Sequence, residues 1–322
     1  MKKILLFGAS GNMGGYMAEY FLQNLPAGYE VIGVDRVANP AVEKMIRIIT
    51  MDINNTEEYS KLPTEDVYAV IDMIGPMPAV MKGYHPIVYV ETNVLGSFKV
   101  FDYAVRVHAD RILYAKSFCD IVKRGETQLI LHADDAPLFD YNDDHSVYSI
   151  TQNAAKDLLR TMHEHYGIKT YTFILPHIYM WNKNDEYCVN GVPRKIMHRI
   201  IIDKAIAGET LEVWGDPSRP KDMVYVKDQC QVFFKGCFTD KETGVYCVGT
   251  GIGTPLVEQI EGMRDVFGGA KKSDIIFCPE KPNSPQYIMD IKETVEDLGY
   301  KPKYSYLETL EDMRKERELA RF

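Results

Sequence analysis

Short apolar runs alternate with longer amphipathic segments through the first half of the chain. The runs have the length and composition of buried strands; they are Ile4–Phe7, Val31–Val34, Ile46–Met51, Ala69–Ile74, Ile112–Ala115 and Tyr171–Leu175. The segments Asn12–Leu25, Val88–Val107 and Tyr148–Tyr166 place apolar residues at helical spacing, and Gly167 caps the last of them. Helical connections of this length join parallel strands. The pattern therefore predicts an α/β fold built on a doubly wound parallel sheet.

The alternation stops after Pro176, where a smaller region is expected. A polar loop at Asn182–Asn190 and a helix at Arg194–Ala207 follow, and residues 223–251 then resume the pattern of strands and helices. We expect residues 1–176 to form the first domain and residues 223–251 to return to it. Residues 177–222 and 252–322 then form a smaller C-terminal α/β region.

The first predicted strand leads into a glycine-rich turn, Gly8-Ala-Ser-Gly11-Asn-Met-Gly14, directly before a helix. Gly8 permits a sharp turn, Gly11 a close approach of the backbone to a phosphate, and Gly14 tight packing of the helix on the sheet. The helix N-terminus, reached through Asn12 and Met13, offers unpaired N–H groups to an anion. An ordinary strand-to-helix connection could contain the same glycines, but an acid at the end of the next strand favours a Rossmann dinucleotide site.

That acid is Asp35, which follows the run Val31–Val34 and lies 21 residues beyond Gly14. A carboxylate at this position accepts hydrogen bonds from the adenosine ribose and repels a 2′-phosphate. Asp35 therefore predicts NAD as the cofactor. Arg36 could attract the extra phosphate of NADP, which is the less favoured alternative.

Composition narrows the class of protein further. The chain has 322 residues and a formal net charge of −9, with charges of both signs interspersed. This argues against a nucleic acid or a membrane surface as partner. The six cysteines show no Cys-x-x-Cys pair and no zinc-like spacing with the eight histidines. We therefore expect reduced thiols, no metal and a cytoplasmic location.

Two hydroxyl side chains indicate the chemistry. Ser117 ends the fifth strand, where α/β folds bind their ligands, and Tyr148 opens the helix that ends at Tyr166. Serine and tyrosine hydroxyls beside a nicotinamide can move a proton at an alcohol oxygen while a hydride is transferred. The pair predicts redox chemistry on a sugar or another alcohol.

With these motifs, the whole chain resembles the extended short-chain dehydrogenase/reductase family, whose members are mostly NAD-dependent nucleotide-sugar epimerases and dehydratases. The resemblance rests on the glycine turn, Asp35, Asp52-Ile53, Asn93-Val94, Tyr114–Ser117, Tyr148–Leu159, Gly215–Asp228, Gly244–Gly249 and Asp290–Pro302. It implies that Tyr148 is the general base and that Ser117 hydrogen-bonds the reacting oxygen. It also implies that the cofactor is contacted by Asp52, Ile53, Asn93 and Pro176, that the C-terminal region binds a nucleotide-linked sugar, and that the protein is a homodimer.

The catalytic motif departs from the family at one position. The family has a lysine four residues after the tyrosine, where its charge lowers the pKa of the tyrosine, and this chain has Gln152. Gln152 can still bind the nicotinamide ribose, so we expect Tyr148 to act more slowly or at higher pH. Lys116 and Lys156 are candidates to replace the charge, although side-chain direction disfavours the first and distance the second.

A second departure follows Ser117. The family's dehydratases have Asp-Glu after the catalytic Ser or Thr, whereas this chain has Phe118-Cys119, which argues against a 4,6-dehydratase. The GDP-mannose 3,5-epimerases and GDP-fucose synthases of the family have a cysteine here that exchanges protons next to a keto group. Cys119 is therefore either a catalytic thiol, with Glu186 as the expected partner and Lys183 close by, or a small buried apolar side chain.

Basic residues mark the expected site for a substrate diphosphate. By the resemblance, Lys221 and Lys281 stand near the positions of phosphate-binding arginines, and Arg219 and Arg194 are further candidates. A lysine attracts phosphate as a point charge, with less geometric definition than an arginine. Each of these side chains could instead be a solvated surface cation.

Taken together, the sequence predicts an NAD-dependent epimerase or oxidoreductase that acts on a sugar, expected to be nucleotide-linked, by transient oxidation. One alternative is a keto-sugar epimerase that uses Cys119 for proton exchange. The other is a dinucleotide-binding protein whose catalytic centre has decayed.

Overall fold

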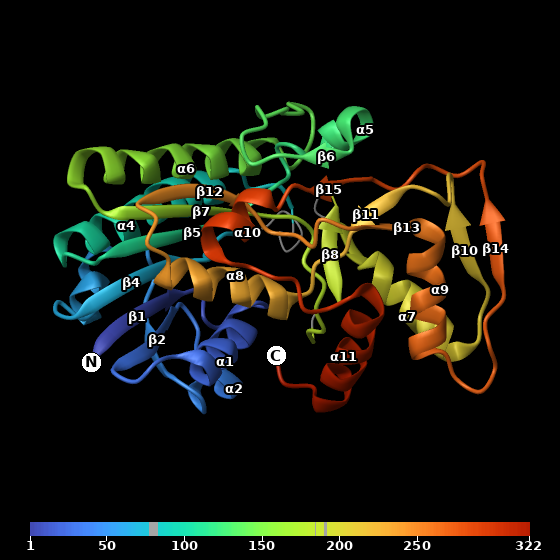
Figure 1. Cartoon of the computed structure of the whole chain (residues 1–322), viewed down its shortest axis with the longest axis horizontal. Helices are drawn as coiled ribbons and strands as arrows, with labels where there is room; N and C mark the ends of the chain where they lie inside the picture. The colour runs from blue at the N-terminus through green and yellow to red at the C-terminus, as the bar shows by residue number, and fades with distance from the viewer. Residues whose placement is uncertain (77–82, 184, 190–191) are drawn as a thin grey trace.

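A seven-stranded parallel sheet forms the larger half of the molecule (Figure 1). The structure is a computed structural model and describes residues 1–76, 83–183, 185–189 and 192–322. The strand order is β12-β7-β5-β4-β1-β2-β3. The strands are β1 (Lys2–Phe7), β2 (Tyr29–Asp35), β3 (Arg47–Thr50), β4 (Val67–Asp72), β5 (Arg111–Ser117), β7 (Lys169–Leu175) and β12 (Thr243–Cys247). The predicted doubly wound parallel sheet is confirmed.

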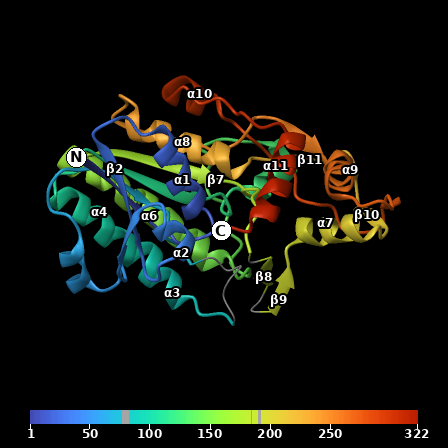
Figure 2. The same cartoon turned by 90° about the horizontal axis from the view of Figure 1, so that it is seen from below.

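Helices cover both faces of this sheet (Figure 2). One face carries α1 (Gly14–Asn24), α8 (Val226–Phe238) and α10 (Lys292–Leu298), and the other carries α4 (Ser97–Arg106) and α6 (Ser146–Tyr166). Side chains of β1 alternate between the two layers: Ile4 and Leu6 pack in the core under α1, and Leu5 and Phe7 in the core under α4. This burial on both faces explains why the strands read as continuous apolar runs.

The smaller half is a mixed region built around the helices α7 (Met197–Ala207), α9 (Leu256–Phe267) and α11 (Tyr306–Leu319). A parallel pair, β10 (Leu211–Trp214) and β14 (Ile275–Cys278), lies at its outer side (Figure 1). Three short pairs lie between this edge and the large sheet. They are β8 (Glu186–Val189) with β9 (Val192–Lys195), β11 (Pro220–Asp222) with β13 (Gly253–Pro255), and β6 (Ile130–Leu131) with β15 (Ile288–Met289).

The chain crosses between the two halves more than once. Residues 223–251 contribute α8 and β12, and β12 pairs with β7 at one edge of the large sheet. From the segment 252–322, α10 contacts α8 and β12, whereas α11 contacts α9. The division into two domains remains a prediction, because the C-terminal segment contacts both halves.

Three expected elements differ in detail. The helix expected at Val88–Val107 has three parts: α3 (Ile87–Tyr89), a π-helical turn at Val90–Gly96 and α4. The expected helix from Arg194 begins only at Met197, because residues 192–195 form a strand. In the polar loop expected at 182–190, residues 186–189 form β8, and Asn184 and Asn190 lie outside the described residues.

None of the helices that the structure describes has both the length and the apolar character needed to cross a membrane.

Two glycines of the first turn are predicted to tolerate alanine differently. A Cβ on Gly14 would lie 2.3 Å from the Ala9 carbonyl oxygen, whereas a Cβ on Gly11 has its nearest neighbour 3.3 Å away. We expect Gly14→Ala to lower the free energy of unfolding by about 2 kcal/mol because backbone must move. Gly11→Ala should change it by less than about 0.5 kcal/mol. Urea denaturation measures both, and equal stabilities would contradict the packing role of Gly14.

Candidate active site

The glycine turn lies where the order of strands reverses, between β1 and β4. Gly8 has φ +89°, and a Cβ there would lie 3.2 Å from the Met73 backbone, so a side chain would strain the turn. Gly11 is exposed, and Asn12 and Met13 lead into the N-terminus of α1. Doubly wound folds bind a dinucleotide at the point where the strand order reverses, with the pyrophosphate at the N-terminus of a helix. The cradle fits the pyrophosphate of NAD.

The expected adenosine contacts lie at the same edge, after β2 and β3. The Asp35 carboxylate accepts hydrogen bonds from the backbone N–H of Ser10 at 2.9 Å and of Arg36 at 2.7 Å, which fix its position. The Arg36 side chain is exposed. Asp52 accepts from the Asn54 N–H at 2.9 Å, and Ile53 is buried directly after it. These groups remain candidates for the ribose and the adenine.

Three elements meet beyond the glycine turn, at the end of β4. Asn93, in the π-helical turn, is buried and donates to the Thr151 hydroxyl on α6 at 3.0 Å. A Cβ on Gly75 would lie 3.4 Å from Gln152 Nε2 and 3.5 Å from Asn93 Oδ1, so these side chains converge there. Pro176 is buried immediately after β7. Asn93, Gln152 and Pro176 thus lie at the expected nicotinamide end of the cradle.

Ser117, Cys119 and Tyr148 form one connected group at the end of β5. The Ser117 hydroxyl lies 3.1 Å from Cys119 Sγ, accepts the Cys119 N–H at 3.3 Å and lies near the Tyr148 hydroxyl. Burial and then the neighbouring Cys119 raise the pKa of Tyr148 above its ordinary value, and the nearby Ser117 hydroxyl partly opposes them. Burial likewise raises the pKa of the Cys119 thiol. The structure therefore holds all three groups in their protonated forms at neutral pH.

Gln152, at the position where the resemblance leads one to expect a lysine, points its oxygen at the strand. Its Oε1 accepts the Ser117 backbone N–H at 3.1 Å, and the side chain is 3% exposed. A lysine at this position could not accept that hydrogen bond. Gln152 therefore anchors the backbone of Ser117 and brings no positive charge to Tyr148.

The nearby lysines do not supply the missing charge. Lys116 is buried and pairs with the Asp120 carboxylate, with 2.6 Å between Nζ and Oδ1. Burial lowers the pKa of Lys116, and the charge of Asp120 partly restores it. Lys156 lies 3.8 Å from Asp157. Asp120 balances the charge of Lys116, so Lys116 does not stand in for the family's lysine.

A second group of side chains lies after β7 and on α7, and it combines two histidines with a tyrosine. His177 follows Pro176, and its ring centroid lies 5.0 Å from that of Tyr179 and 5.8 Å from that of His198 on α7. The His177 side chain is exposed at the surface, but desolvation by the surrounding protein, aided by the charge of Lys221, shifts its pKa below the ordinary value. Burial alone lowers the pKa of Lys221, with no carboxylate compensating it among the described residues. His198 was not expected from the sequence, because no spacing connects it with His177.

The other expected substrate contacts are engaged elsewhere. Arg219 pairs with Glu126 at 2.5 Å and donates to the Ser284 carbonyl at 2.7 Å. Lys281 pairs with Glu212 at 2.5 Å and lies over the Trp214 ring. Glu186 is exposed on β8, and Arg194 is exposed on β9. These side chains do not join the group around Cys119.

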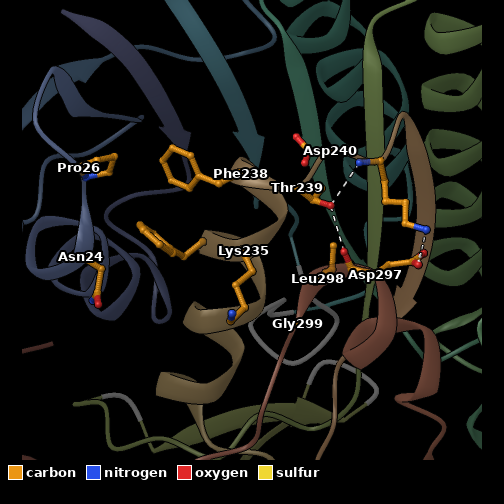
Figure 3. A pocket seen from close by; sticks show the side chains of 11 residues that line it. Asn24, Pro26, Lys235, Phe238, Thr239, Asp240, Asp297, Leu298 and Gly299 are labelled. Atoms are coloured by element: carbon orange, nitrogen blue, oxygen red, sulfur yellow. Dashed lines mark hydrogen bonds and ion pairs between the residues drawn. The ribbon is translucent and has the colours of Figure 1, made fainter.

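A separate cavity of about 750 Å³ lies beside α8, where residues of α8, the end of α1 and α10 line it (Figure 3). It is lined by Asn24, Pro26, Phe234, Lys235, Phe238, Thr239, Asp240, Lys241, Asp297, Leu298 and Gly299. Within it, Lys241 pairs with Asp297 at 2.6 Å. None of the expected site residues lines this cavity, so the catalytic group is not located there.

Comparison with known proteins gives a consistent set of matches. The NAD dependent epimerase/dehydratase family model matches residues 4–249. The low-salt glycan biosynthesis protein Agl12 of Haloferax volcanii is 26% identical over 320 residues, 96% of each chain. A putative UDP-glucose 4-epimerase of Methanocaldococcus jannaschii is 22% identical over 306 residues, 93% of each chain. The structure of UDP-N-acetylglucosamine 4-epimerase from Bacillus cereus has a TM-score of 0.79 at 18% identity, over 100% of both chains.

The family model covers most of the chain, and the fold and the glycine cradle agree with it. The chain therefore belongs to the NAD-dependent epimerase/dehydratase family, as its motifs predicted, and is an enzyme whose dinucleotide is NAD.

Proposed function

We propose that this protein is an epimerase that oxidises a nucleotide-linked sugar transiently with NAD. The proposal rests on the proximity of the Ser117 and Tyr148 side chains, at the strand edge that also carries the glycine cradle. The names of two relatives support it, since one is a putative UDP-glucose 4-epimerase and another a UDP-N-acetylglucosamine 4-epimerase. The five described cysteines that are free suit a reducing, cytoplasmic location. By the family resemblance, we expect a homodimer.

In this mechanism the chain's own residues hold the sugar and move its proton. Bound NAD supplies the chemistry of hydride acceptance from a sugar carbon and return to it. In its minor phenolate form, Tyr148 takes the proton from the sugar hydroxyl and gives it back, while Ser117 hydrogen-bonds the same oxygen. Gln152 keeps Ser117 in place through the strand amide. Lys221, with His177 and His198 beside it, binds the anionic part of the substrate.

Cys119 favours a second candidate function. Its thiol lies in the catalytic group, 3.1 Å from the Ser117 hydroxyl, rather than among purely apolar neighbours. A thiol there could exchange a proton at the carbon next to a keto group of the sugar. The protein would then invert a stereocentre without net hydride transfer.

The function is tested by incubating the protein with NAD and UDP-, GDP- and dTDP-linked sugars in deuterated water, with proton NMR of the products. Transient oxidation predicts an epimer that contains no solvent deuterium at carbon, because the hydride returns from the cofactor. Proton exchange through Cys119 predicts deuterium at the inverted carbon. Absence of product across the panel would contradict both candidates for these nucleotide sugars.

Replacing Tyr148 by phenylalanine removes the proposed base and keeps the ring. We expect Tyr148→Phe to lower kcat by about 10²-fold to 10⁴-fold, with the affinity for NAD unchanged. Tyr141→Phe is the matched control, because Tyr141 is exposed in the loop before α6. A Tyr148→Phe enzyme with activity near that of the control would rule out the assigned role.

Replacing Gln152 by lysine restores the family's charge next to Tyr148. A cation stabilises the phenolate, so the pKa of Tyr148 falls and the rise of kcat with pH moves to lower pH by about one unit. Gln152→Met is the neutral control, because it also loses the hydrogen bond from Ser117. It should lower kcat without shifting the pH at which kcat rises. The pH profiles of kcat measure both variants, and an equal shift of the profile in both would show that the added charge does not cause it.

A further inference from the structure

A buried ion pair lies directly behind the catalytic serine. The Lys116 and Asp120 side chains are 2% and 3% exposed, and Lys116 Nζ lies 2.6 Å from Asp120 Oδ1. Lys116 also donates to the Ser117 carbonyl at 3.1 Å. The pair therefore closes the turn that contains Ser117 and Cys119.

Asp120 extends this turn to the helix that carries Tyr148. Asn153 on α6 donates from Nδ2 to Asp120 Oδ2 at 2.9 Å, and the same amide donates to the Ser149 carbonyl at 2.9 Å. The Asp120 carbonyl accepts the Leu138 N–H at 2.6 Å, within the loop that leads to α6. Asp120 thus joins the end of β5 to α6 and to the loop before it.

Stability alone is a poor reason for this arrangement. Moving both charges out of water costs free energy that offsets much of their mutual attraction. Well-packed apolar side chains of similar volume often stabilise a protein equally well. A buried charged pair instead restricts its neighbours to a narrow range of positions, because each buried donor and acceptor must keep its hydrogen-bond partner. The position of the pair, between the Ser117 turn and α6, indicates what that geometry controls.

We propose, on the basis of the function proposed above, that Lys116, Asp120 and Asn153 are positioning residues that set the separation of the Ser117 and Tyr148 hydroxyls. Gln152 holds the amide of Ser117, and Asn153, the next residue, holds the far end of the same turn through Asp120. The two side chains clamp the turn at both ends. The clamp keeps Ser117 and Tyr148 aligned on one substrate oxygen, and Cys119, which lies within the turn, is held with them.

The test uses Asn153→Leu, which removes the link to Asp120, keeps the same number and branching of side-chain heavy atoms and leaves both members of the ion pair in place. We expect kcat to fall about tenfold, because a small misplacement of catalytic groups is costly, with KM and the NAD affinity within about twofold. Alkylation of Cys119 by iodoacetamide, followed by peptide mass spectrometry, should accelerate severalfold as the turn loosens. Asn153→Ser serves as a second variant if leucine is not tolerated.

Arg111→Met is the matched control, because Arg111 is a buried cation at the other end of β5. Its side chain is 5% exposed, pairs with Asp110 at 2.6 Å and donates to the Thr239 carbonyl at 2.9 Å. This variant should lower Tm and change neither kcat nor the alkylation of Cys119.

The proposal would be overturned if the rate of Cys119 alkylation in the Asn153 variants were unchanged. It would also be overturned if that rate changed only as much as it does in Arg111→Met. The alkylation rate needs no substrate, so it tests the clamp even if the proposed function fails. If turnover is present and kcat is unchanged in Asn153→Leu, the clamp fails while the function stands.

Discussion

The hydrogen bond from the Ser117 amide to the Gln152 side chain joins the end of β5 to the second turn of α6. Ser117 and Tyr148 belong to different elements, so their hydroxyls meet only when the strand and the helix keep this register. Asn93 holds the same helix from the π-helical turn through Thr151. The catalytic group depends on these anchors, because a serine at the end of a free strand would have no fixed partner.

The parallel sheet explains why residues far apart in the sequence share one site. Its strands run in the same direction, so the glycine turn after β1, Asp35 at the end of β2 and Ser117 at the end of β5 all lie at the carboxyl edge. The smaller half adds Lys221, which has no balancing carboxylate among the described side chains, and the neighbouring pair His177 and His198. Lys221 is therefore the candidate contact for the anionic part of a substrate.

The sequence predicted the strands of the large sheet well, because burial on both faces makes each strand a continuous apolar run. It also placed Ser117 at the end of a strand and Tyr148 at the start of a helix, and the structure brings the two together. It did not predict β9, since the exposed residues 192–195 have no apolar signal and pair only with β8. Nor could spacing show that Lys116 pairs with Asp120 or that His198 meets His177, because such contacts depend on side-chain direction and on packing between distant segments.

The central claim is that Tyr148 is buried without a neighbouring cation among the described residues, so that at neutral pH only a small phenolate fraction acts as the base. The most direct measurement is the NMR titration of Tyr148 in the protein without bound NAD, with ¹³C-labelled tyrosine and assignment by the Tyr148→Phe variant. Burial without a neighbouring cation predicts that the Tyr148 signal stays in its protonated position from about pH 6 to about pH 9. Ionisation with a midpoint near pH 7 would contradict the account, because it would require a positive charge beside the phenol that the clamp does not provide.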